Sequence, residues 1–212
     1  MSNEFGYIPE SPEQSFGNNK GIFTPTDIYD LTRADKYTQY GQLELIQTQT
    51  PSAVTTIDFT SIQESIYNVH LLTWALNPSG DETGLVRLST DSGSSFVTSG
   101  YKHAEQFGDA GGTFSESRST SASFLARLGD QTGAGSNELI NGYMYFYNLG
   151  DSTKHSYSSY HTTGLDTSAV YTMMFGSAVY PTANTVNAIR LFGNIGFNFT
   201  GTISLYGIKE YS

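Results

Sequence analysis

The stretch TISLYGI, residues 202–208, shows the residue alternation that decides the fold class. Ile203 and Leu205 alternate with Ser204 and Tyr206, and a period of two marks a strand with one buried face. Such a strand near the end of the chain is tolerated when its edges are paired or covered, because bare backbone edges invite aggregation. The stretch therefore predicts a closed sandwich whose final strand lies inside a sheet.

From about Gln42 onward, short strand-like runs alternate with turn clusters. The sequence holds 22 Gly, 15 Tyr and 13 Phe, which suits pleated sheets and the turns between them. Many short strands with almost no helix between them indicate an all-β sandwich or barrel. A hairpin is expected around NLGDST, and the polar residues 102–119 are expected to form a long loop. The expected strands are 43–48, 55–59, 68–75, 84–89, 121–128, 138–149, 154–163, 169–180, 187–191 and 201–211.

Residues 1–42 differ from the rest, because their aromatic residues are isolated and show no sustained periodicity. They predict an extended arm with one short helix near 26–37, in which Thr26 caps the first turn and Asp27 favours it electrostatically. The apolar stripe of this helix is too narrow to hold an independent domain. We expect the arm to dock on another chain, the alternative being that it wraps its own β domain, residues 43–212. The anchoring residues would be Phe5, Tyr7, Phe16, Phe23, Ile28 and Leu31.

The charge balance narrows the classes of partner. The chain carries 20 Asp plus Glu against 10 Lys plus Arg, a formal net charge of −10. With so few positively charged side chains, the protein is poorly suited to neutralise phosphates. This argues against nucleic acids and anionic membranes as binding partners. There is no cysteine, so disulfides and thiolate chemistry are excluded. The beginning of the chain shows no secretory signal and no apolar run long enough to span a membrane, so we expect synthesis in a cytosol.

No constellation of residues points to catalysis. In an extended strand His155 and His161 would share one face with Tyr157, but six residues span roughly 20 Å, too far to share a metal ion. His70 lies in an apolar run and is expected to be a core or interface residue. No G-x-S-x-G motif occurs, no pair of carboxylates suggests a glycosidase, and Asp91 lacks the spacing of a calcium loop. The sequence predicts a protein without catalytic residues, metal or cofactor.

What remains is a set of aromatic and polar side chains suited to surface recognition. Tyrosine offers a rigid amphipathic face, and small hydroxyls and amides between tyrosines give adaptable hydrogen bonds. Tyrosine is also a good strand former, so a purely structural role stays equally open. The candidate recognition residues are Tyr101, His103, His155, Tyr157, Tyr160 and His161, with Tyr171 and Tyr180 as further tyrosines of this kind.

Four stretches of the β-rich part carry a resemblance to a known family. They are TTIDFTSIQESIYNVHLL (55–72), GLVRLSTDSGSSFVTSGY (84–101), NGYMYFYNLGDSTKHSY (141–157) and VNAIRLFGNIGFNFTGTISLYGI (186–208). Together they resemble a jelly-roll-like β-sandwich module of tailed-bacteriophage virion proteins, over about residues 50–212. The arm stretch SFGNNKGIFTPTDIYDL (15–31) is similar to the leaders of small structural proteins of marine phages. The resemblance implies an antiparallel jelly-roll-like sandwich, commonly trimeric, and supplies no catalytic residue.

The resemblance and the composition together suggest a non-enzymatic virion structural protein, made in the cytoplasm of the host bacterium. The arm would bind other virion proteins, and the sandwich would project as a fibre, knob or spike, with a host-surface glycan as a further partner. One alternative is a capsid decoration protein that bridges capsid subunits. A third hypothesis is a free sandwich that binds or cleaves carbohydrate. Neither nucleic-acid binding nor membrane insertion is expected.

Overall fold

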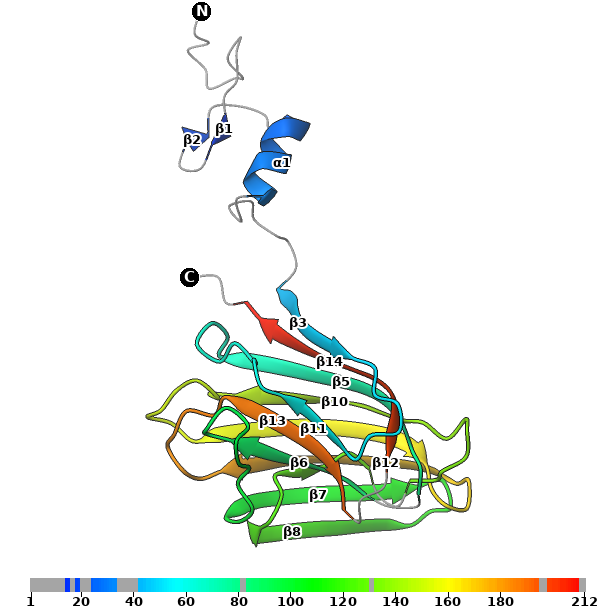
Figure 1. Cartoon of the computed structure of the whole chain (residues 1–212). Helices are drawn as coiled ribbons and strands as arrows, with labels where there is room; N and C mark the ends of the chain where they lie inside the picture. Colours follow the sequence, from blue (N-terminus) through cyan, green and yellow to red (C-terminus); the bar gives the residue numbers. More distant parts are fainter. Residues whose placement is uncertain are drawn as a thin grey trace, which may run out of the picture. The chain divides into compact units, whose positions relative to one another are not determined.

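The structure, a computed structural model, describes residues 14–15, 18–19, 24–33, 42–80, 83–129, 132–194 and 198–209. Contacts divide the chain into two units, Met1–Gln42 and Leu43–Ser212. Figure 1 labels most of their elements. The first unit contains the short hairpin β1 (Gln14–Ser15) and β2 (Asn18–Asn19), followed by the helix α1 (Pro25–Arg33). The second unit contains twelve strands among its described residues.

Helix α1 begins with a reciprocal capping arrangement. Thr24 Oγ1 accepts the amide N–H of Asp27 at 3.2 Å, while Asp27 Oδ2 accepts the amide N–H of Thr24 at 2.8 Å. The sequence-based choice of Thr26 as the cap is therefore wrong, because Pro25 fits the first helical position and moves the cap to the residue before it. Ile28 and Leu31 are half-buried. The other expected anchoring residues lie outside the described residues: Phe5, Tyr7, Phe16 and Phe23.

The second unit is a sandwich of two antiparallel sheets (Figure 1). One sheet has eight strands in the order β3 (Leu43–Gln49), β14 (Phe199–Ile208), β5 (Val69–Pro78), β10 (Ile140–Tyr147), β11 (Ser156–Leu165), β12 (Tyr171–Tyr180), β7 (Tyr101–Asp109) and β8 (Phe114–Ala122). The other has four strands in the order β4 (Thr56–Phe59), β13 (Ala188–Gly193), β6 (Gly84–Ser89) and β9 (Ala126–Arg127). The expected all-β sandwich is confirmed.

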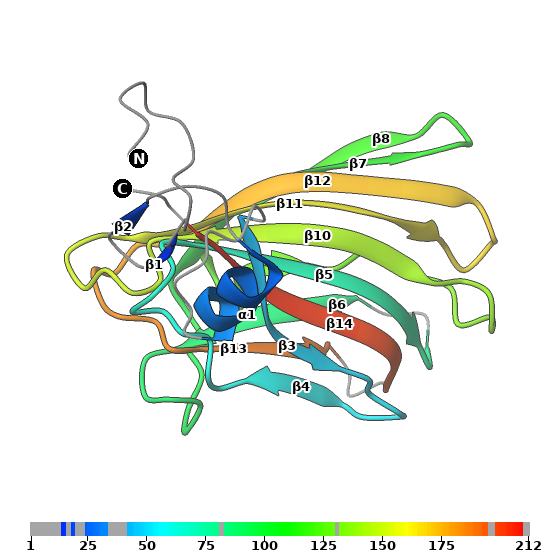
Figure 2. The same ribbon diagram turned by 90° about the horizontal axis from the view of Figure 1, so that it is seen from above.

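The strand order is that of a jelly roll with two added hairpins. Without β7–β8 and β11–β12, the strands form the four-stranded sheets β3-β14-β5-β10 and β4-β13-β6-β9. The chain passes between these sheets in the manner of two Greek keys, which defines a jelly roll. Both hairpins extend the first sheet only, and Figure 2 shows them continuing that sheet beyond β10. The second sheet is half as wide, so it leaves part of the larger sheet without a facing sheet.

The core follows from strand alternation. In β5, His70, Leu72, Trp74 and Leu76 point inward and are buried, while the residues between them are half-buried on the other face. One hydrophobic cluster joins Leu72, Trp74 and Leu76 to buried side chains of the four-stranded sheet. His70 lies in this core, as the sequence predicts, with its Nε2 atom 2.8 Å from the carbonyl oxygen of Ile62. Burial lowers the pKa of His70, so the ring stays neutral and Nε2–H donates this bond.

The last strand pairs on both sides, as the opening stretch predicts. β14 lies between β3 and β5 in the larger sheet. The buried ring of Tyr67 packs on the backbone of this strand at Gly207. A Cβ atom at Gly207 would lie 2.3 Å from that ring, so glycine is required there by the close approach. Tyr67 also donates a hydrogen bond to Glu44 Oε2 on β3.

Residues 102–119 are not a loop, which corrects the sequence-based expectation. They belong to the hairpin β7–β8, joined by a short turn after Asp109. His103, Glu105 and Phe107 point inward from β7 and are buried. Polar inward-facing residues hid the alternation on which strand prediction depends. The hairpin β10–β11, expected around NLGDST, is confirmed.

Candidate functional site: the outer face of the eight-stranded sheet

The outer face of the larger sheet carries an extended band of tyrosine and aliphatic side chains. This face consists of the residues that alternate with the inward-pointing core residues of each strand. Strand register aligns them in three rows across the sheet. The rows, which together we call the tyrosine face, are Leu43, Ile208, Val69, Tyr147, Tyr157 and Val179; Leu45, Tyr206, Leu71, Tyr145, Ser159 and Ser177; and Thr48, Ser204, Thr73, Tyr143, His161 and Phe175.

Several of these side chains are strongly exposed. Leu45 is 59% exposed, Tyr157 48%, Phe175 45% and Tyr143 44%. The tyrosines of β10 lie against one another, since the ring centroids of Tyr143 and Tyr145 are 5.8 Å apart. Contacts of this kind hold the side chains in place and reduce the entropy that a partner would have to remove on binding.

The tyrosine face contains no Asp, Glu, Lys or Arg. The face covers six strands, which lie about 4.8 Å apart, and three rows, which lie about 6.8 Å apart along the strands. Its side chains therefore spread over an area of about 24 by 14 Å. Charged outward-facing residues begin on the next strand, β7, where Lys102 pairs with Val179. They continue on β8 with Glu116 and Arg118. An uncharged, partly apolar patch of this size on a chain with net charge −10 marks a surface suited to contact with another molecule.

The structure separates the expected recognition residues into two groups. Tyr157 and His161 lie on the tyrosine face, and His155 is exposed immediately before β11. Their common exposed face agrees with the alternation read from the sequence. Their ring contacts are to neighbouring aromatics, with the His161 and Tyr143 centroids 6.0 Å apart.

The other three expected recognition residues are buried, which corrects their assignment to the surface. Tyr101, His103 and Tyr160 occupy inward positions of β7 and β11. The Tyr101 hydroxyl accepts the amide N–H of Leu88 at 2.9 Å, and burial raises its pKa. Its ring packs against Tyr180, which is also buried. A shift of one residue in a strand exchanges the two faces, and the sequence alone did not fix that register.

A buried ion pair joins the added hairpins to the smaller sheet. Glu105 is 2% exposed and accepts hydrogen bonds from Arg127 Nη1 at 2.9 Å and from the Tyr160 hydroxyl at 2.7 Å. Burial and the neighbouring Glu105 carboxylate raise the pKa of Tyr160, which keeps the hydroxyl protonated as a donor. His103 stacks on Phe124 with a centroid distance of 5.1 Å, and burial lowers its pKa. This cluster is structural, since its charges satisfy one another inside the protein.

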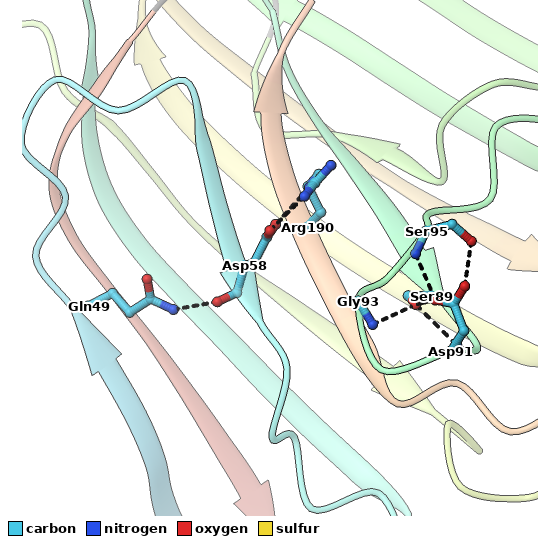
Figure 3. A network of polar contacts seen from close by, with 7 residues as sticks. All are labelled: Gln49, Asp58, Ser89, Asp91, Gly93, Ser95 and Arg190. Carbon is cyan, nitrogen blue, oxygen red and sulfur yellow. Dashed lines mark hydrogen bonds and ion pairs between the residues drawn. The ribbon is translucent and has the colours of Figure 1, made fainter.

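A second polar network lies on the outer face of the smaller sheet (Figure 3). Arg190 donates to both carboxylate oxygens of Asp58 at 2.7 Å, and its guanidinium lies 3.9 Å from the centroid of Phe96. Gln49 Nε2 donates to the carbonyl oxygen of Asp58 at 2.8 Å, which links β3 to β4 (Figure 3). The bidentate geometry and the ring contact explain how a half-exposed Arg is held rigidly.

Asp91 closes a turn beside this network. Its carboxylate accepts hydrogen bonds from the Ser89 and Ser95 hydroxyls and from the Ser95 amide (Figure 3). These bonds, chiefly those from Ser95, lower the pKa of Asp91 to about 2. Within the described ranges, no group of three or more His, Asp or Glu residues is placed to hold a metal ion.

The comparisons with known proteins returned no relative from which a role could be transferred. No protein-family model matches the chain, and no curated protein matches it. Among the described helices, none has the length and apolar character required to cross a membrane.

Proposed function

We propose that this chain is a non-enzymatic structural protein of a bacteriophage virion. Residues 1–42 anchor it to other virion proteins, and the jelly-roll domain projects as a fibre, knob or spike. The observation that supports this proposal is the tyrosine face, an uncharged contact surface on a strongly acidic protein. Jelly rolls occur in viral coat proteins and in lectins, and the fold by itself does not decide between such roles.

The partner best suited to the tyrosine face is a further copy of this chain, in a homotrimer. Copies with a net charge of −10 repel one another, and contact through an uncharged surface avoids bringing like charges directly together at the interface. Interface cores are depleted in charged residues and enriched in aromatic ones, as the tyrosine face is. Contact through this face also covers apolar side chains such as Leu45 and Phe175, which are otherwise in water.

Placing charge on the tyrosine face is expected to dissociate the trimer. The double variant Tyr143→Glu, Phe175→Glu introduces two carboxylates at positions that are 44% and 45% exposed, so the monomer can still fold. We expect the association constant to fall by at least about tenfold, because carboxylates would be desolvated or brought together at the interface. Light scattering after size-exclusion chromatography measures the change.

Ile66→Glu is the matched control, since Ile66 is 67% exposed and does not belong to the tyrosine face. It should leave the trimer intact. A wild-type chain that stays monomeric at high concentration, or a double variant that still forms trimers, contradicts the proposed interface.

The anchoring role is tested by deletion of residues 1–42. We expect the remaining jelly-roll domain, which has its own core, to stay folded but to disappear from purified phage particles, as judged by mass spectrometry of virions. Incorporation of the truncated chain at the wild-type level would contradict the anchoring role. Copy number in the same particles separates an appendage from a capsid decoration protein, because decoration requires hundreds of copies and an appendage a small multiple of three or six.

A further inference from the structure

A cavity of about 170 Å³ opens at one end of β7, β8, β11 and β12. Its buried lining residues Phe107, Thr162 and Met174 point to the inner face of the larger sheet, on the side opposite the tyrosine face. The cavity lies in the part of the sheet built by the added hairpins. The remaining lining residues are Gly108, Asp109, Thr113, Ser115, Asp166, Thr172 and Met173.

The β7–β8 turn and the β11–β12 turn each place one aspartate at this cavity. Asp109 Oδ1 accepts the amide N–H of Thr113 at 3.0 Å in the β7–β8 turn. Asp166 Oδ1 accepts the amides of Ser168 at 2.8 Å and Val170 at 2.9 Å in the β11–β12 turn. The turns are joined directly, because the Ala110 amide donates to the carbonyl oxygen of Tyr171 at 2.9 Å. Both carboxylates are therefore fixed before any ligand arrives, and Asp166 Oδ2 accepts no hydrogen bond from the described residues.

Thr162 adds a hydroxyl to the wall of the cavity. The residue is 2% exposed and lines the cavity. Its hydroxyl can both donate a hydrogen bond to a polar ligand and accept one from it. Thr172 and Ser115 add two further hydroxyls to the same wall.

We propose that this cavity binds a single uncharged sugar residue. Sugar hydroxyls can donate to the carboxylates and exchange hydrogen bonds with threonine and serine, while Phe107 and Met174 give an apolar wall for the carbon-bound hydrogens of the ring. A volume of about 170 Å³ far exceeds the ~10–15 Å³ that one water needs and lies below the ~300–1,000 Å³ of drug-sized sites. This site is separate from the trimer interface and does not rest on the virion role.

The lining residues argue against charged ligands. They include no Lys, Arg or His, so nothing there neutralises an anion. A calcium ion takes six to eight oxygen ligands, whereas the cavity offers only two carboxylates, each with one oxygen held by backbone amides. A neutral polyol uses these same groups without a further charge.

The methionines provide a direct test in the full-length protein. Among the four methionines of the chain, Met173 and Met174 line the cavity, and Met144 is buried in the core and does not line it. With methyl-¹³C-methionine labelling, titration with methyl α-glucopyranoside, methyl β-galactopyranoside and methyl α-mannopyranoside should shift the signal of the inward-pointing Met174 for at least one of the three. We expect a dissociation constant on the order of 1 mM and an unchanged Met144 signal.

Asp166→Asn is expected to weaken that binding by about tenfold or more, because it removes a charged acceptor. Asp151→Asn is the matched control, since Asp151 closes the β10–β11 turn through the Thr153 amide at 2.9 Å and does not line the cavity. The Met144 signal reports that both variants are folded. No shift with any of the glycosides, an equal response in Asp166→Asn, or a response to calcium chloride alone would overturn the proposal. None of these outcomes bears on trimer formation, which is measured separately.

Discussion

Replacing Arg127 with methionine should lower the free energy of unfolding of the jelly-roll domain by about 3–5 kcal/mol, the range found when one partner of a buried ion pair is removed. Glu105 is 2% exposed, and Arg127 is its only cationic partner among the described residues. Methionine keeps most of the side-chain volume near Phe107 and Phe124, so the loss reports on charge. The Tyr160 hydroxyl alone cannot compensate a buried carboxylate.

Urea unfolding followed by tryptophan fluorescence measures this effect, because the single Trp74 lies in the core. Arg118→Met is the control, since the ion pair of Arg118 with Glu116 is exposed and such pairs contribute about 0–1 kcal/mol. Adding Glu105→Gln to Arg127→Met should recover much of the loss by removing the unpaired charge. Equal effects of the two arginine variants would show that Glu105 is not stabilised by Arg127.

Replacing Gly207 with alanine is expected to destabilise the domain by up to about 3 kcal/mol, the upper part of the usual range for overpacking a core. The added Cβ would lie 2.3 Å from the ring of Tyr67. That ring cannot move freely, because Tyr67 is buried and its hydroxyl is bonded to Glu44. Either the ring or β14 has to shift, and β14 pairs with both of its neighbours.

Gly164→Ala is the matched control, because Gly164 is also a strand glycine but its added Cβ would have no contact closer than 3.4 Å. Its effect should be small. The double variant Gly207→Ala, Tyr67→Leu should cost less than the two single changes added together, since the smaller side chain makes room. Strictly additive costs would show that the clash with Tyr67 is not the cause.

The parts of the fold that sequence reasoning predicted are those with strong local signals. Alternation in residues 202–208 identified the strand that became β14, and turn chemistry around NLGDST identified the hairpin β10–β11. The β7–β8 hairpin was missed because its inward positions include His103 and Glu105, whose burial depends on partners elsewhere in the chain. Arg127 and Tyr160, which the folded structure brings close to Glu105, make a carboxylate acceptable there.

The candidate sites were predictable only in part, for a related reason. Alternation placed Tyr157 and His161 on one strand face, but Tyr160 lies on the opposite face of the same strand. Which face is buried is decided by register with β10 and β12. The cavity depends on two turns that lie far apart in the sequence and meet through one backbone hydrogen bond, a contact that no local pattern records.

The strand order makes the two added hairpins unequal parts of the larger sheet. The β11–β12 hairpin pairs directly with β10, whereas β7–β8 pairs with that sheet only through β12. A chain without β7–β8 would keep every other strand pairing of the larger sheet and would end at β12, whereas a chain without β11–β12 would deprive β7 of its present partner strand.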